Sequence, residues 1–404
     1  MKKFILYFSF VFTWVCLLFV LINLISLGLI RMEVKWKKKE PDYFSHLNLE
    51  AYTAGLNVCL KDSNYVRENL NDLLALCLKE PGEYQYYPGL EFTNRPFASK
   101  HINIISRSYD IPFRLCQKEN SPSVAPELAY AIYCFGGSTT FGSLVSDAHT
   151  WPGFLSELLN IPQSQTPIVV KNYGTSGYTP TQETEKFLHL LKLGHRPSLA
   201  IFMDGVNTGP QFDGSEFSRT MAEKLQTNPD FASSLKQLIN TLPVVKILQF
   251  NPSDYSFADG NAEETYPLEI NGQYNDKIVN RFRVNARLRK KIGDLFGVKV
   301  INILQPSTFV YCPLEFLTQK QKSSITDILS KNSRILYQKL TQEDSLFISF
   351  DGLFNEYNLP PVTDGLHYSP GFNRFLAQKI IPYIDYKELN TFKLDTAAAS
   401  GVPF

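Results

Sequence analysis

The sequence predicts an α/β fold built on a mostly parallel sheet. From Leu128 onward, short apolar runs rich in Ile, Val, Tyr and Phe alternate with amphipathic stretches of helical length. This alternation is typical of βα units. Five runs separated by helices predict parallel strands covered by helices on both faces. The predicted strands are residues 129–135, 167–172, 199–203, 298–304 and, more weakly, 346–350.

Two helix starts can be read from the residues that open them. Thr179 is followed by Pro180 and then by Gln182, which fits a capping box with proline in the first turn. Ser369 and Pro370 open the last long helix in the same way. Residues 244–250 are either a further strand or part of an insertion. In open α/β sheets, ligands gather where strands end and helices begin, so the chemistry is expected there.

Composition restricts the class of protein. A chain of 404 residues with 44% hydrophobic content can bury one large core, or one core with a small appendage. Its 40 basic and 39 acidic side chains nearly cancel, so no field gathers nucleic acid and no such partner is expected. The oligomeric state is not decided by the sequence.

The N-terminal segment predicts a membrane anchor. Residues 4–30 carry no charge and consist largely of Phe, Leu, Ile and Val. At a rise of ~1.5 Å per residue, such a helix is longer than the roughly 30 Å hydrocarbon core. A cleaved signal peptide is the alternative, because Ser26 and Gly28 are small. The apolar run is, however, about twice the usual ~7 to 15 residues, which favours a retained single-pass anchor.

The charges beside this segment point to one orientation. Lys2 and Lys3 precede it, whereas five basic residues follow it, at positions 31, 35, 37, 38 and 39. The positive-inside rule then places the rest of the chain in the cytoplasm. A substrate in the cell envelope would instead require the rest of the chain to lie outside the cytoplasm, so the residues leave the orientation open.

The predicted domain organisation has four parts. Residues 1–31 form the anchor or signal segment, and residues 32–126 form a juxtamembrane linker with a small N-terminal subdomain. Residues 127–388 form the α/β domain, and residues 389–404 form a C-terminal tail. The linker is charged and the passage after it is rich in aromatic residues and proline, without the βα alternation.

Cysteine and histidine usage predicts no metal or cofactor site. Of six cysteines, Cys16 lies in the apolar segment and five lie outside it. Cys59 and Cys77 are either a disulfide of an oxidising compartment or two buried thiols. Cys134 lies in an apolar run and is expected in the core. His46, His101, His149, His189 and His195 have no metal-ligand spacing.

Glycine-rich sequence follows the first predicted strand. Residues 136–142 read Gly-Gly-Ser-Thr-Thr-Phe-Gly, with Ser138 at the expected start of a helix. Glycines permit a sharp turn, and the helix amides beside a serine favour developing negative charge. A phosphate-binding turn is the alternative, but the Gly-Lys-Ser/Thr ending of a P-loop is missing. An ordinary turn is the other interpretation of this segment taken alone.

Three further strand ends carry polar residues. Gly177 follows the second strand and can present its backbone amide, and Asn207 follows the third and can donate from its side chain. Asp364 and His367 stand three residues apart before the last helix, where the carboxylate can fix the imidazole tautomer. Taken alone, each has a structural interpretation: a tight turn, a loop asparagine, a surface or core histidine. Their combination favours a catalytic site over these structural interpretations.

Together the four segments resemble the SGNH (GDSL-like) hydrolase family. The likeness covers roughly Leu128 to Ile381, and the Gly-Gly-Ser-Thr-Thr-Phe-Gly form is typical of a large bacterial branch. The resemblance implies a three-layer α/β/α, flavodoxin-like fold with about five mostly parallel strands. It implies Ser138, Asp364 and His367 as catalytic triad, and the Ser138 amide, the Gly177 amide and the Asn207 side chain as oxyanion hole.

The sequence departs from the family pattern at Thr208 and in two insertions, and a competing hydrolase fold can be weighed on its residues. The third segment of the family usually reads Asn-Asp, but Thr208 follows Asn207 here, which puts the support of Asn207 in doubt. An α/β-hydrolase also orders its triad serine, acid, histidine, but its nucleophile elbow needs Gly-x-Ser-x-Gly, and Thr140 stands at the second glycine position. Insertions around residues 211–242 and 312–340 are expected to shape the substrate cleft.

The function implied is that of a membrane-anchored serine esterase with an acyl-serine intermediate. The family and the anchor favour an O-acyl or O-acetyl group on an envelope glycan or lipid as substrate, with the catalytic domain outside the cytoplasm. One alternative is an O-acyltransferase that uses the same triad. The other, from a different class, is a catalytically silent glycan-binding envelope protein.

Overall fold

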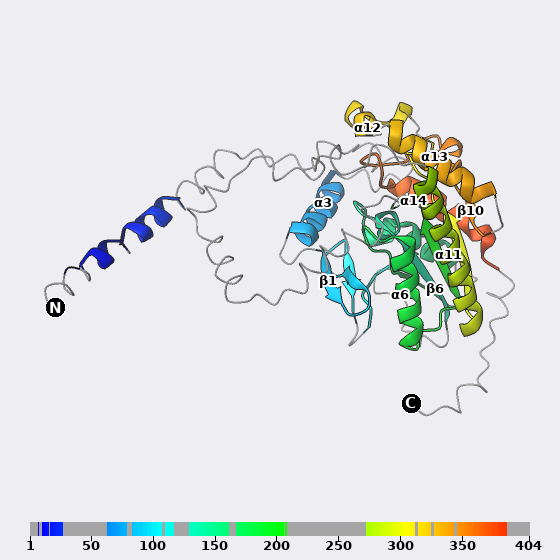
Figure 1. Ribbon diagram of the computed structural model, residues 1–404, viewed down its shortest axis with the longest axis horizontal. Helices are drawn as coiled ribbons and strands as arrows, with labels where there is room; N and C mark the ends of the chain where they lie inside the picture. Colours follow the sequence, from blue (N-terminus) through cyan, green and yellow to red (C-terminus); the bar gives the residue numbers. More distant parts are fainter. Residues whose placement is uncertain are drawn as a thin grey trace, which may run out of the picture. The chain divides into compact units, whose positions relative to one another are not determined.

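The structure of the chain is a computed structural model (Figure 1). It describes residues 7, 10–15, 17–26, 63–78, 83–106, 110–116, 129–160, 167–205, 207, 272–311, 314–324, 327–342 and 346–385. The chain divides into two units. One comprises residues 1–45 and 226–265, and the other comprises residues 46–225 and 266–404.

In the first unit, residues 10–15 and 17–26 are helical. Many of their large apolar side chains are exposed to solvent, among them Phe10, Trp14 and Leu24. Within the described ranges, no helix combines the length and the apolar character needed to cross a membrane. The membrane span over residues 4–30 stays a prediction.

The second unit is built on an eight-stranded sheet in the order β10-β9-β8-β6-β7-β5-β4-β3. Five neighbouring strands run parallel and lie close to the predicted bounds, so the predicted parallel sheet is confirmed. They are β6 (Tyr130–Gly136), β7 (Ile168–Asn172), β8 (Leu199–Asp204), β9 (Lys299–Leu304) and β10 (Ile348–Ser349).

Three antiparallel strands between residues 97 and 114 extend the same sheet, and one of them, β5, pairs with β7. They are β3 (Phe97–Ala98), β4 (Asn103–Ile105) and β5 (Phe113–Arg114). A separate hairpin is formed by β1 (Tyr84–Tyr87) and β2 (Glu91–Asn94). Strands of two or three residues are too short to show a periodic pattern, which is why sequence analysis did not find them. The division at residues 126 and 127 stays a prediction.

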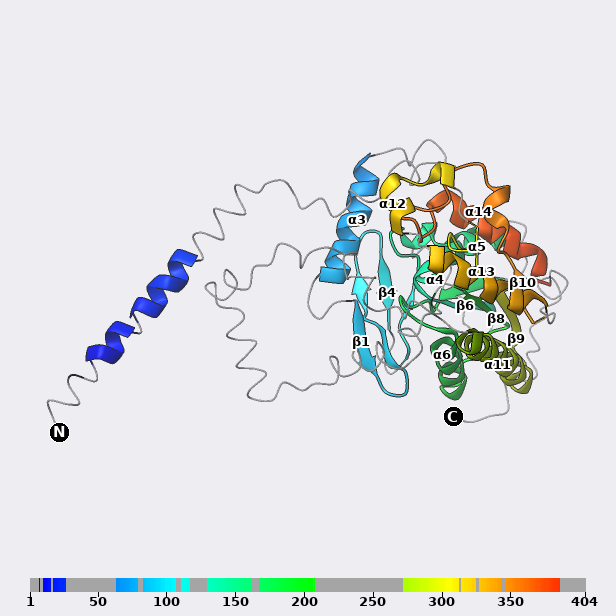
Figure 2. The ribbon, with the colours of Figure 1, turned by 45° about the horizontal axis from the view of Figure 1, so that its top comes forward.

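Helices cover both faces of the parallel strands, as Figure 2 shows. On one face lie α5 (Trp151–Leu159) and α14 (Pro370–Ile380), and on the other α6 (Pro180–Lys192) and α11 (Gly272–Phe296). Further helices and 3₁₀ turns among the described residues of this unit are α3 (Ser63–Leu78), α4 (Ser138–Phe141), η3 (Asp147–His149), η6 (Leu314–Phe316), α12 (Gln319–Ser324), α13 (Asp327–Gln342), η7 (Leu353–Glu356) and η8 (Ile381–Tyr383).

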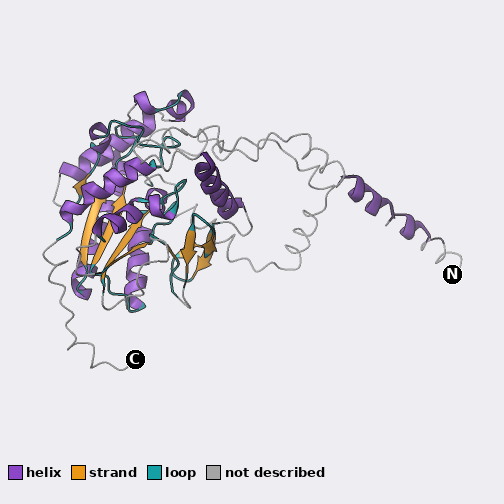
Figure 3. Ribbon diagram, turned by 180° about the vertical axis from the view of Figure 1, so that it is seen from behind, coloured by secondary structure: helices purple, strands orange, loops and turns teal. Residues whose placement is uncertain are grey.

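The core lies between the sheet and these helix layers, with the strands seen between helices in Figure 3. Cys134 of the central strand β6 is fully buried, as expected. Aromatic rings fill the side under α6: Phe135 stacks on Phe202 at 4.6 Å between ring centres and on Tyr173 at 5.7 Å. Offset aromatic pairs of this kind stabilise a core beyond their buried area.

Both predicted helix starts are confirmed. The backbone amide of Thr179 donates to Gln182 Oε1 over 3.1 Å at the start of α6. The hydroxyl of Ser369 accepts from the Phe372 amide over 3.2 Å at the start of α14. The expected strand or insertion at residues 244–250 and the cysteine at position 59 lie outside the described residues. The pairing of Cys59 with Cys77 stays a prediction.

Candidate active site

Ser138 stands where β6 ends and is the first residue of α4. The two glycines before it are required by close contacts. A Cβ atom at Gly136 would lie 2.0 Å from Thr140 Oγ1. One at Gly137 would lie 2.4 Å from Asn207 Nδ2. The backbone amide of Ser138 has no intrahelical acceptor, since the first four amides of a helix lack one. Ser138 therefore presents a hydroxyl and an N–H donor at the carboxyl edge of the sheet.

Asp364 and His367 lie on one tight loop before α14. The Thr363 amide closes this loop by donating to His367 O over 2.8 Å. Asp364 Oδ1 accepts from the amides of Leu366 and His367 at 3.0 and 2.8 Å. Its other oxygen, Oδ2, lies 2.6 Å from His367 Nδ1. A carboxylate can only accept, so Nδ1 carries the proton and Nε2 is left as an acceptor.

The pairing of these two side chains sets their protonation. Only 17% of the Asp364 and 18% of the His367 side chain is exposed. Burial alone would raise the pKa of Asp364, but the charge and hydrogen bonds of His367 lower it from 3.8 to about 2. Burial would lower the pKa of His367, but the charge and hydrogen bond of Asp364 raise it above 6.5. Each partner favours the charged form of the other.

A second carboxyl group, that of Glu83, acts on the same imidazole. Its charge adds to the rise in the pKa of His367, while burial raises the pKa of Glu83 itself. The next residue, Tyr84, donates to Ser176 O over 3.2 Å. The start of the β1–β2 hairpin thus contacts the turn that carries Gly177, and the carboxyl group just before it acts electrostatically on His367. Sequence analysis missed this effect because the hairpin carries no motif and is distant along the chain.

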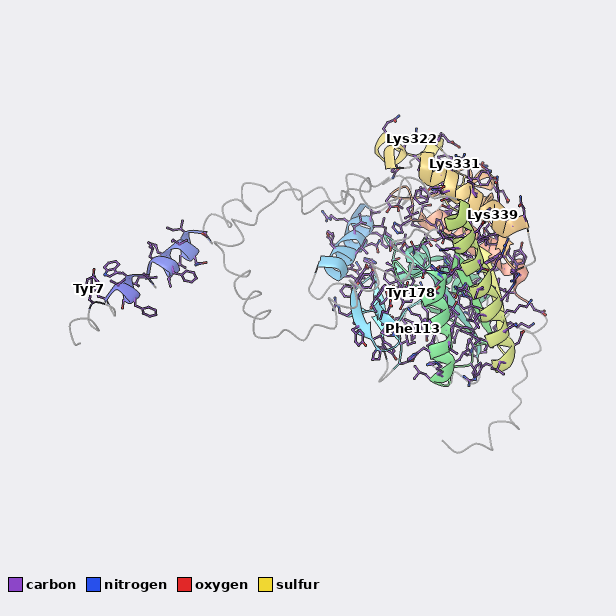
Figure 4. All side chains as sticks on the ribbon, viewed as in Figure 1. Tyr7, Phe113, Tyr178, Lys322, Lys331 and Lys339 are labelled. Atoms are coloured by element: carbon purple, nitrogen blue, oxygen red, sulfur yellow. The ribbon has the colours of Figure 1, made fainter. Side chains whose placement is uncertain are left out.

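Gly177 and Asn207 come from the turns after β7 and β8. Gly177 has φ +78°, a left-handed conformation that glycine adopts readily. Asn207 Nδ2 donates to Tyr178 O over 2.8 Å. Ser138, Asn207 and Tyr178 line one small cavity, and Tyr178 is labelled in Figure 4. The structure thus brings Ser138 and Asn207 around the same space, with Gly177 next to Tyr178 in the chain.

Ser138 and His367 are not joined by a hydrogen bond in the part of the chain that the structure describes. They are connected through the loop after β9. Near one end of this loop, Thr139 Oγ1 donates to Gln305 Oε1 over 2.8 Å. At the other end, Thr308 Oγ1 donates to the carbonyl oxygen of Gly365 over 2.7 Å. The predicted catalytic roles of the site residues stay predictions.

Arg114 of β5 holds the segment that follows Ser138. Its side chain is fully buried, with Nε 2.7 Å from Asp147 Oδ1. Its other N–H groups donate to the carbonyl oxygens of Phe141, Gly142 and Val145 at 2.7, 2.8 and 2.5 Å. A guanidinium has five N–H donors and can satisfy all of these acceptors at once. Strand β5 therefore supports the serine turn that begins at Ser138, and no sequence motif indicates this role.

Replacement of Arg114 by Met is expected to lower the free energy of unfolding by about 3–5 kcal/mol, because Asp147 is left as an uncompensated buried charge. Urea denaturation measures this loss. Lys291→Met is the control, since the Lys291 side chain is exposed, and it is expected to change stability by less than about 0.5 kcal/mol. Equal stabilities of the two variants would contradict the assigned role of Arg114.

A layer of buried charges lies beneath the turns that carry Gly177 and Asn207. Arg289 of α11 is fully buried and contacts Asp204 at 2.5 Å and Glu183 at 3.3 Å. Burial, with the charge of Asp204, raises the pKa of Glu183 against the effect of Arg289. Lys186 of α6 donates to Thr175 Oγ1 over 2.5 Å, and burial lowers its pKa to about 7. Sequence analysis missed this layer, because charged residues on a helix are usually solvated.

Solved structures similar to the chain include several lipolytic proteins and esterases. A member of the lipolytic protein G-D-S-L family from Veillonella parvula is 13% identical, with 62% of this chain and 96% of that chain covered and a TM-score of 0.34. The acetylxylan esterase Axe2 from Geobacillus stearothermophilus is 13% identical, with 64% of this chain and 96% of that chain covered and a TM-score of 0.34. The esterase EstA from Pseudoalteromonas sp. is 12% identical, with 65% of this chain and 100% of that chain covered and a TM-score of 0.31.

The family assignment rests on a family model and not on these distant structural likenesses. No curated protein matches the sequence. The model of the GDSL-like lipase/acylhydrolase family matches residues 132–380, which is more than half of the chain. This range contains the serine turn, the turns with Gly177 and Asn207, and the Asp364–His367 loop. The chain belongs to the GDSL-like lipase/acylhydrolase family and is an ester-hydrolysing serine hydrolase.

Proposed function

We propose that the chain hydrolyses its ester through an acyl-serine intermediate on Ser138. The observation that carries this proposal is the 2.6 Å contact between Asp364 Oδ2 and His367 Nδ1, which leaves Nε2 of the imidazole unprotonated and ready to accept. Ser138 Oγ attacks the ester carbonyl while His367 takes its proton. His367 then protonates the leaving alcohol, and water repeats the sequence on the acyl-enzyme. Asp364 orients the imidazole and stabilises its protonated form.

The negative charge of the tetrahedral intermediate needs donors beside Ser138. We assign this role to the amides of Ser138 and Gly177 and to the side chain of Asn207. Supporting this, Asn207 Nδ2 makes one hydrogen bond, to Tyr178 O, and an amide nitrogen carries a second N–H. Preorganised donors of this kind are each worth on the order of 10²- to 10³-fold in turnover.

The proposed substrate is an O-acyl or O-acetyl group on a glycan or lipid of the cell envelope, and the proposed anchor is residues 4–30. Support comes from the uncharged run in the sequence and from the solvent exposure of many apolar side chains in residues 10–15 and 17–26. The catalytic domain is proposed to lie outside the cytoplasm. A reporter fused to the C-terminus and active only in one compartment tests this, and a cytoplasmic signal would count against an envelope substrate.

Hydrolysis of p-nitrophenyl esters by the full-length protein in detergent tests the activity. Esters of two to twelve carbons give the acyl-chain preference, and hydrolysis of the acetyl ester is the expected result. Labelling by a serine-reactive phosphonate, located by peptide mass spectrometry, is expected at Ser138. Labelling without turnover, together with acyl transfer to an added sugar, would favour the transferase. If the protein is neither labelled by the phosphonate nor hydrolyses any ester, the result would favour a glycan-binding protein without catalysis.

A further inference from the structure

Gln305 is a buried glutamine at the end of β9 whose polar groups are all bonded except one. Its side chain and backbone together are only 2% exposed. Its backbone amide donates to Asp204 O over 2.8 Å, and its carbonyl accepts from Tyr337 Oη over 2.8 Å. The side-chain oxygen accepts from Thr139 Oγ1. The side-chain Nε2 is buried and makes no hydrogen bond. A buried donor without a partner is energetically unfavourable, so an acceptor is expected.

The residues around Gln305 form a place for such an acceptor. Gln305, Ser138 and Asn207 line one cavity of about 10 Å³, together with Glu183 and Asp204. One buried water molecule requires ~10 to 15 Å³ and two to four polar partners. The cavity is therefore polar enough and large enough for one water molecule.

The neighbours of Gln305 also decide which way its amide points. The Thr139 hydroxyl can donate or accept, so it would tolerate either orientation. A reversed amide would direct its oxygen into the cavity that Glu183 and Asp204 line, where the negative charge of Asp204 would repel it. The nitrogen is therefore the atom that belongs on the cavity side.

We propose that this cavity holds one water molecule that accepts from Gln305 Nε2 and donates to the side-chain oxygen of Asn207. Gln305 is then a positioning residue. The water fixes the oxygen side of the Asn207 amide, while Tyr178 O fixes one N–H on the nitrogen side. The second N–H is held toward Ser138, whereas an amide rotated by half a turn would present oxygen to the oxyanion. The inference rests on the proposed function, in which Asn207 stabilises that oxyanion.

The kinetic test compares Gln305→Met with Tyr337→Phe on p-nitrophenyl acetate. Gln305→Met keeps the size of the side chain and removes the donor. A misdirected Asn207 should cost less than its removal, so kcat is expected to fall by about 10- to 100-fold with KM within about twofold. Tyr337→Phe removes only the hydroxyl that holds the Gln305 backbone. It is expected to lower Tm and leave kcat within about twofold. An unchanged kcat in Gln305→Met, or equal losses in both variants, would overturn the proposal.

A crystal structure of the wild-type protein tests the same proposal without relying on turnover. Density for one water within hydrogen-bond distance of both Gln305 Nε2 and the Asn207 oxygen is the expected result. A dry cavity, or a direct contact between the two amides, would overturn it. Inactivity of the wild type on every ester would instead count against the proposed function, and the crystallographic result would still decide whether the water is present.

Discussion

Replacement of Ser138 by alanine is expected to reduce ester hydrolysis by at least about 10⁴-fold, because the acyl-enzyme can no longer form and only substrate positioning remains. Initial rates with p-nitrophenyl acetate measure this. Ser143→Ala is the matched control. Ser143 lies in the same turn, and its hydroxyl contacts Ser176 Oγ at a long 3.4 Å, so its loss is expected to leave the rate within about twofold.

The control separates loss of a nucleophile from damage to the turn. Both variants should keep the Tm of the wild type within a few degrees, since each removes one oxygen atom from a partly exposed side chain. A Ser138→Ala protein that hydrolyses the ester at the wild-type rate would remove Ser138 from the mechanism. Equal losses of hydrolysis rate in both variants would show that the rate depends on the structure of the turn and not on the Ser138 hydroxyl.

Asp364→Asn is expected to reduce the rate by about 10⁴-fold with little change of shape. The amides of Leu366 and His367 both donate to Oδ1, so the oxygen of an asparagine would stay at that position. Its NH₂ group would then face His367 Nδ1, which would have to accept. The imidazole proton would move to Nε2, and the histidine could no longer take the proton of Ser138. Steady-state rates of purified Asp364→Asn measure this effect.

The pH dependence of the same variant gives a second measurement. The pKa of His367 is raised in the native protein, so kcat/KM is expected to rise with pH through a value above 6.5, as the imidazole loses its proton. In Asp364→Asn the residual activity should rise at lower pH, because the attraction that favours the charged imidazole is gone. Identical midpoints in both proteins would contradict the pairing.

The ion pair also predicts how stability changes with pH. The pKa of Asp364 falls from 3.8 to about 2 on folding, so its contribution of about 2 kcal/mol is present above 3.8 and is lost as pH falls through 2. The raised pKa of His367 has the opposite consequence: its contribution is present below 6.5 and is lost at higher pH. The stability difference between wild type and Asp364→Asn should therefore be largest between about pH 4 and 6.5.

The residues that sequence reasoning found and those it missed differ in a physical way. Ser138, Gly177, Asn207, Asp364 and His367 stand directly after strands or before a helix, so a strand pattern and general rules for α/β sheets point to them. Gln305 satisfies the same rule, because it follows the fourth parallel strand. Its position was a usable signal, but one glutamine before a proline indicates no chemistry by itself.

Arg114 and Arg289 could not have been found in this way. Arginine in a strand or on a helix is usually solvated, and neither belongs to a motif. Both are fully buried here, because carboxylates and carbonyl groups from distant parts of the chain meet around them. Glu83 is a similar case, since its effect on His367 depends on where the hairpin packs.

By itself the sequence determined the α/β class, the five parallel strands, the helix starts at Pro180 and Pro370 and the family, because these depend on local periodicity and on short motifs. Tertiary structure alone decided that strands β3, β4 and β5 extend the sheet and that Asp364 holds Nδ1 of His367. It also decided that buried charges support the turns around Ser138. These features arise from contacts between residues far apart in the chain, and no local pattern in the sequence encodes such contacts.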